Sequence, residues 1–170
     1  MHIQIDASDL VKLSEAWKRA PEMVIEELTR ATYEAEMLLE RETKELTPVG
    51  VHNALRGSIH SQMPEVLGNT VIGVVGSPMK YAQAVELGRE PGKWVGYEGV
   101  AAIEDWVRHK LGIPAEEAER VANAVAWKIH LYGTPAVGMF HRALAYNQTR
   151  VGAMFETAAG RIGQRLAGAV

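Results

Sequence analysis

The sequence predicts an α+β fold: an antiparallel β-hairpin-based sheet packed against several helices, with long helices in the N-terminal half and at the C-terminus. Two stretches repeat apolar residues at helical spacing over many turns. Between them, apolar and polar residues first alternate, and a run rich in β-branched residues follows. No internal repeat or low-complexity linker divides the 170 residues, so we predict one domain, residues 1–170.

The N-terminal quarter is predicted to be largely helical. Alternation of Ile3 and Ile5 permits a short strand before a first helix that ends near Ala20. Pro21 suits the first position of a second, longer helix, because the N–H that proline lacks would be unpaired there. Glutamates separate the apolar residues of this helix, and Thr47-Pro48-Val49-Gly50 ends it.

A hairpin is predicted to follow. Leu55–Met63 alternates like a half-buried strand, and Thr70–Gly76 has the β-branched residues of its partner. The connecting segment, 64–69, contains Val66 and Leu67, which an isolated loop would expose unfavourably.

Helical elements are predicted for most of the remaining chain. Their limits are set by glycines that end helices and prolines that open them. In order, we expect a short helix at 81–87 ended by Gly88, an irregular stretch at 89–97, helices at 100–111 and 114–132, and a final helix at about 137–166.

Composition excludes several classes of protein. The net charge is -3, from 18 basic and 21 acidic residues, whereas a general nucleic-acid binder usually has a basic excess. Without cysteine there can be no disulfide framework or thiolate metal site, and no apolar run is long enough to span a membrane. Acidic residues predominate in 21–46 and arginines in 141–170. Three arrangements of these two oppositely charged segments are open: both face solvent, they meet within one subunit, or they join one subunit to the next.

No motif carries an obvious chemistry. Phosphate-binding loops and paired zinc-binding histidines are absent, so we predict no enzyme, no cofactor and no metal. Pairs of carboxylates on the helices are more commonly solvated surface residues than catalytic groups. A catalytic triad could be composed from Ser58, His60, Asp105 and His109, but these are also more commonly polar surface residues. Three aromatic residues near Arg89 and Lys93 either stack on single-stranded bases or anchor an irregular loop: Trp94, Tyr97 and Trp106.

Three segments carry a family resemblance. The first is Thr47-Pro48-Val49 with Leu55-Arg56-Gly57-Ser58-Ile59, similar to T-P-V…G-x-L-x-x-S-I. The second, 75–92, is similar to V-G-S/T…Y-A-x-x-V-E-x-G-x-x-P. The third, Gly133-Thr134-Pro135-Ala136 with Phe140 and Ala143, is similar to G-T-x-A-x-x-F-x-x-A. In this order they resemble the tail-component family of long-tailed bacteriophages, the tail-completion or neck proteins of lambdoid-type virions, over residues 22–166.

The resemblance implies a structural virion protein at the head–tail junction. It would form a homo-oligomeric ring, six-fold or twelve-fold, that completes the tail or joins it to the head as a connector and lets packaged DNA pass without sequence-specific binding. Its partners would be adjacent head-completion, tail-terminator or tail-tube proteins, with assembly in the bacterial host cytoplasm and no membrane. The alternatives are a tail terminator or head-closure protein and, in another class, a small nucleic-acid-binding regulator.

The resemblance also singles out residues with structural roles. The sequence differs from the family pattern in the loop at 50–54 and in a helical insertion at about 93–132. Glu86 lies close to the C-terminal end of a predicted helix, where a carboxylate interacts unfavourably with the helix dipole. A cation such as Arg56 or Arg89 would offset this unfavourable interaction. The motif positions carried over are Pro48, Leu55, Ser58, Gly76, Tyr81, Ala82, Glu86, Gly88, Pro91, Gly133, Thr134 and Phe140.

Two further sets of residues are assigned to assembly. A docking loop onto the adjacent ring or tail tube is predicted at Pro64, Val66, Leu67 and Gly68. Lumen or intersubunit positions are predicted at Glu34, Glu40, Arg150, Arg161 and Arg165, with the glutamates nearer the channel because acidic groups repel DNA phosphates.

Overall fold

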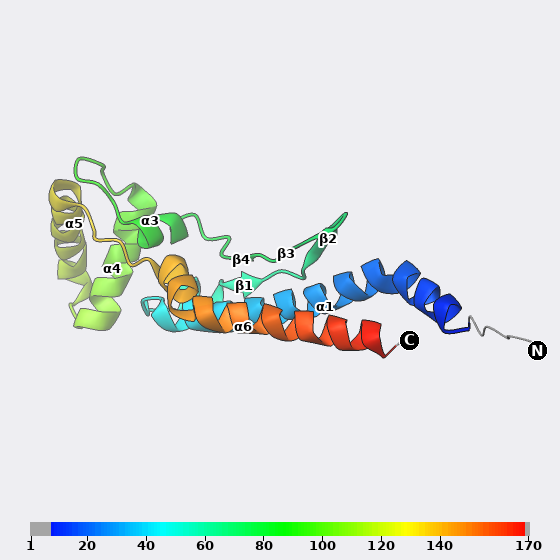
Figure 1. Cartoon of the computed structure of the whole chain (residues 1–170). Helices are drawn as coiled ribbons and strands as arrows, with labels where there is room; N and C mark the ends of the chain where they lie inside the picture. The colour runs from blue at the N-terminus through cyan, green and yellow to red at the C-terminus, as the bar shows by residue number, and fades with distance from the viewer. Residues whose placement is uncertain (1–7, 169–170) are drawn as a thin grey trace, which may run out of the picture. The chain divides into compact units, whose positions relative to one another are not determined.

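A computed structural model describes residues 8–168 (Figure 1). The chain is mostly helical (66%), with six helices and two small antiparallel two-stranded sheets in that range, so the α+β class is confirmed. The strand expected at Ile3 and Ile5 lies outside the described residues. The elements are α1 (Ser8–Leu46), α2 (Ala54–Gly57), β1 (His60–Ser61), β2 (Glu65–Leu67), β3 (Thr70–Ile72), β4 (Val75–Gly76), α3 (Ala82–Leu87), α4 (Tyr97–Leu111), α5 (Ala115–Tyr132) and α6 (Met139–Ala167).

Helix α1 continues through Pro21, so the predicted break near Ala20 is wrong. An internal proline removes one backbone hydrogen bond and costs about 3 kcal/mol. No glycine or second breaker accompanies Pro21, and the remaining hydrogen bonds of this 39-residue helix outweigh that cost. The predicted end at Thr47 is confirmed, because α1 finishes at Leu46.

The first predicted strand is wrong over most of its length. Residues 54–57 form the single turn α2, and only His60 and Ser61 form β1. Leu55 and Ile59, both buried, are four residues apart, a separation that suits a helical turn as well as a strand. Alternation alone therefore could not decide between the two structures.

The hairpin itself is present, but its tip differs from the prediction. Strand β2 pairs antiparallel with β3, and Leu67 faces Thr70 across the two-residue turn Gly68-Asn69. Val66 and Leu67 consequently lie in a strand and not in a docking loop; among the predicted loop residues, Gly68 forms the turn and Pro64 precedes the strand. A two-residue turn with glycine first is enough to reverse a hairpin. Strand β1 pairs with β4.

The later helices are present as predicted, although α4 begins at Tyr97, three residues before the predicted start and within the stretch predicted to be irregular. Helix α3 ends at Gly88, α4 ends at Gly112, and α5 follows Pro114. Helix α6 begins at Met139, slightly later than expected.

The chain divides into two compact units. Unit 1 comprises residues 8–40, 61–75 and 146–168 as described here, and unit 2 comprises residues 41–60 and 76–145. The single-domain assignment stays a prediction. In unit 2, α4 and α5 pack against each other. Fully buried alanines, four residues apart on α5, allow that close approach: Ala118, Ala122 and Ala126.

In unit 1, α1 and the C-terminal part of α6 lie side by side (Figure 1). The carboxylate of Glu27, only 2% exposed, accepts hydrogen bonds from Arg161 Nε at 2.7 Å and from Arg165 Nη1 at 3.1 Å. Arg165 also donates to Glu26 at 2.9 Å. The sequence left three arrangements of the acidic and basic segments open. At these residues the two segments meet within one subunit.

This pairing predicts acid sensitivity. The hydrogen bond from Arg161 and, after it, that from Arg165 lower the pKa of Glu27, although burial opposes them. A carboxyl whose pKa is lower in the folded state stabilises the fold above its ordinary pKa and loses that contribution as the pH falls. Glu27→Gln should therefore lower the Tm at neutral pH and flatten its decline between about pH 7 and pH 3. The exposed Glu156→Gln is the control; parallel Tm profiles for the two variants would contradict this role.

Candidate functional site

The three motif segments converge in unit 2. Leu55 of the first segment and Ala82 of the second form a buried apolar cluster with Met139, and Phe140 of the third segment packs against it. The hydroxyls of Ser58 and Ser77 are 2.7 Å apart, which joins the first segment to the second. Residues far apart in sequence thus form a single frame.

Backbone hydrogen bonds join the second segment to the third. Arg89 and Thr134 exchange two bonds of 3.0 Å as an isolated antiparallel bridge, and Val137 N–H donates to Val85 O at 3.0 Å. Gly88 and Gly133 flank this bridge, where the two backbones approach closely. The motif glycines are therefore explained by packing of main chain on main chain.

Glu86 caps helix α6 and is not paired with Arg56 or Arg89, so the predicted cation is wrong. Its Oε2 accepts the N–H of Phe140 and its Oε1 accepts the N–H of His141, both at 3.0 Å. The first N–H groups of a helix have no partner within it and lie at the positive end of its dipole. A carboxylate from another segment satisfies both requirements.

Glu86→Ala should lower the free energy of unfolding by about 1–2 kcal/mol, the range for a lost N-terminal cap. Glu90→Ala is the matched control, because Glu90 is exposed and its 3.3 Å ion pair with Lys93 should contribute about 0–1 kcal/mol. Chemical denaturation of both variants checks this. Equal losses would show that Glu86 has no special structural role.

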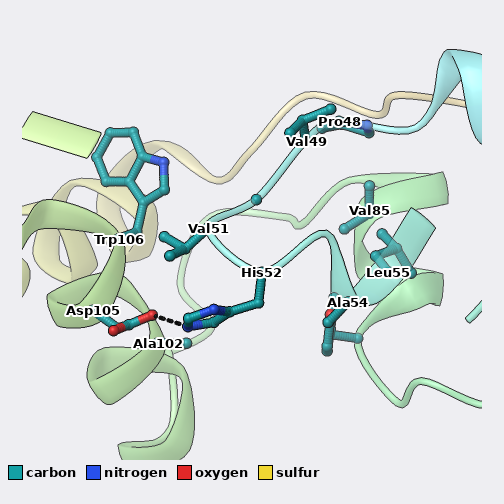
Figure 2. Close-up of a pocket in the computed structure, with 12 residues that line it drawn as sticks. Pro48, Val49, Val51, His52, Ala54, Leu55, Val85, Ala102, Asp105 and Trp106 are labelled. Atoms are coloured by element: carbon teal, nitrogen blue, oxygen red, sulfur yellow. Dashed lines mark hydrogen bonds and ion pairs between the residues drawn. The ribbon is translucent and has the colours of Figure 1, made fainter. Parts of the chain in front are cut away.

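A pocket of about 400 Å³ opens beside this frame (Figure 2). Its wall includes three predicted motif residues, Pro48, Leu55 and Tyr81. The other side chains are mainly apolar and come from the loop after α1, from α2, from α3 and from α4: Val49, Val51, Ala54, Val85, Ala102 and Trp106. Val49, Tyr81 and Trp106 are each more than one third exposed. An open apolar pocket of this kind suits recognition of apolar side chains.

Asp105 lies between two histidines at the pocket rim. Its Oδ2 is 3.0 Å from His52 Nε2, and its Oδ1 is 3.1 Å from His109 Nδ1 (Figure 2 shows the His52 contact). The first contact attaches the loop at 48–53 to α4.

The structure does not bring Ser58 or His60 to this carboxylate, so the conceivable triad does not form; Ser58 instead bonds to Ser77 and to Leu55 O. Among the described residues, no group of three or more His, Asp and Glu could hold a metal ion.

The predicted aromatic cluster is not assembled. Trp94 packs against Trp127 and His130 of α5, with ring centroids 5.8 and 5.6 Å apart. Tyr97 is 90% exposed, and Trp106 lines the pocket of Figure 2. Arg89 Nη2 donates to Trp94 O at 3.2 Å, so the ring and the guanidinium fix an irregular loop on a helix.

Two carboxylates of α1 hold the two arms of the hairpin within unit 1. Glu36 Oε1 accepts the N–H of Val74 at 2.6 Å. Glu40 Oε2, one helical turn later, accepts the N–H and the hydroxyl of Ser61 at 2.6 and 2.8 Å. Glu40 therefore has a partner inside the subunit. Burial raises the pKa of Glu36, and the Val74 N–H opposes the rise.

Beyond this anchor the hairpin is exposed. Val66 is 44% exposed, Leu67 53% and Ile72 40%. Within residues 8–168 each strand pairs with one other strand only, so both outer edges of the hairpin are unpaired there. The other assembly candidates are exposed Glu34 on α1 and Arg150, which donates to Asn147 at 3.3 Å.

The sequence did not reveal the pocket. Asp105 and His109 are one helical turn apart in the sequence, but His52 is 53 residues from Asp105, in the loop after α1. No family model, curated protein or solved structure matches this chain. No helix within residues 8–168 is long and apolar enough to cross a bilayer.

Proposed function

We propose that this chain is a structural subunit of the head–tail junction of a long-tailed bacteriophage. Copies of it form a homo-oligomeric ring that completes the tail or joins it to the head and lets DNA pass. The observation that carries the proposal is the β2–β3 hairpin, which is anchored firmly on α1 yet has exposed apolar residues and open edges.

A two-stranded hairpin is at best marginally stable alone in water, and unpaired apolar edges invite association. Here hydrogen bonds from Ser61 and Val74 to carboxylates fix its base. A rigid, apolar, uncovered hairpin is suited to a subunit whose neighbours cover it.

The convergence of the motif segments supports the same function. Leu55 and Ala82, from two of the segments that resemble the neck family, belong to the buried apolar cluster of unit 2. Backbone hydrogen bonds join the second and third segments. In this proposal the hairpin-based sheet packs on the helices within one domain, and α4 and α5 are an insertion at about 93–132 that extends the family's shorter form.

Charge placement supports a channel for DNA. Arg161 and Arg165 are engaged by Glu26 and Glu27, whereas Glu34 is exposed on α1. A lumen lined by such glutamates repels phosphates and lets DNA slide. The partners would be adjacent connector, tail-terminator or tail-tube rings, the location would be the virion, and the subunit would not be a catalyst.

Negative-stain electron microscopy of the concentrated protein tests the proposal. Annular particles with an open centre are expected, together with little affinity for DNA at physiological salt. Particles without a central opening, or tight DNA binding that weakens steeply with salt, would contradict it and favour a nucleic-acid-binding regulator.

A further inference from the structure

We infer that the apolar pocket of Figure 2 receives the hairpin tip of a neighbouring copy, with the side chain of Leu67 entering it. The inference rests on the proposed ring and specifies the contact that builds it. One copy supplies the hairpin of unit 1, and the next copy supplies the pocket of unit 2.

The two surfaces match in size and chemistry. Truncating one buried leucine leaves a cavity of roughly 150 Å³. A pocket of about 400 Å³ thus has ample room for the side chain of Leu67. Its wall is mainly apolar, with exposed Val49 and Trp106 at the opening, so both partners would bury apolar surface that water now covers.

Charge complementarity indicates the same occupant. The segments of unit 1 (1–40, 61–75 and 146–170) contain eleven acidic and seven basic residues. Those of unit 2 contain ten acidic and eleven basic residues. A surface of the acidic unit is therefore better matched to unit 2 of another copy than to a second unit 1, which disfavours a symmetric pairing of hairpins.

Contact between unlike surfaces also explains ring formation. When one patch of a subunit binds a different patch of the next, repetition of the contact closes a ring if the rotation permits. The hairpin and the pocket are two such patches, each present once per chain. Each protomer of a closed ring would then have its hairpin covered and its pocket filled.

The natural absence of cysteine allows a direct test. Leu67→Cys is placed in one preparation of the full chain and Val49→Cys in a second, differently tagged preparation. The two preparations are mixed and treated with a short bismaleimide. A cross-link that joins position 67 to position 49 can then form only between two different chains. The control replaces Val49→Cys with Leu111→Cys, because both residues are 52% exposed and both belong to unit 2.

The expected result is that the Leu67→Cys chain is cross-linked to the Val49→Cys chain at least about tenfold faster than to the Leu111→Cys chain, because docking raises the local concentration of the two thiols. Similar rates for the two pairs, in protein that still forms annular particles, would overturn the pocket assignment and leave the proposed ring intact. Equal rates together with only monomers would overturn both.

Discussion

Gly133→Ala is expected to destabilise the protein by about 2–4 kcal/mol, among the largest effects of a single methyl group. Gly133 has φ 71° and ψ -164°, a region open essentially to glycine alone. A Cβ built there would lie 2.1 Å from the carbonyl oxygen of Arg89, a backbone atom that cannot turn aside. The variant should therefore break the bridge that joins the second and third motif segments.

Gly163→Ala in α6 is the matched control. Apart from the neighbouring residues and backbone of α6 itself, no atom of the described residues lies within 4 Å of a Cβ at that position, and alanine should stabilise the helix by up to about 1 kcal/mol. Urea unfolding of both variants checks the contrast. Equal stability of the two proteins would mean that the backbones at Arg89 and Gly133 do not approach as described.

Leu67→Asp should abolish assembly while leaving the subunit folded. Leu67 is 53% exposed, so the change costs little in a monomer, but burying its carboxylate at a contact should weaken association by about 100-fold or more, about 2.8 kcal/mol. Size-exclusion chromatography with light scattering would report the change in mass. Leu111→Asp, at 52% exposure, should assemble normally. Unchanged assembly of the Leu67 variant would remove the hairpin from the interface.

Local signals predicted much of the fold. Gly88, Gly112 and Pro114 fix helix limits through backbone geometry alone, and their effects were predicted correctly. Pro21 and Leu55 were misinterpreted because a long helix tolerates one proline and because a four-residue spacing fits two structures. At Leu55, packing against Ala82 and Met139, which are distant in sequence, favours the helical turn.

The candidate site was predictable only in part. Of the motif residues singled out from the sequence, Leu55 and Ala82 share a buried cluster in unit 2 and Phe140 packs against it. The role of Glu86 was not predicted, because its partners are backbone N–H groups 54 and 55 residues away, and backbone groups leave no trace in side-chain identity. His52 reaches Asp105 across a similar separation, so the pocket emerges only from tertiary structure.

Native mass spectrometry of the wild-type protein over a concentration series tests the central claim most directly. A single closed species of fixed subunit number, increasing at the expense of monomer and never growing further, is the predicted result. A monomer that persists at the highest concentration, or a ladder of ever larger species, would contradict a ring built from one repeated contact.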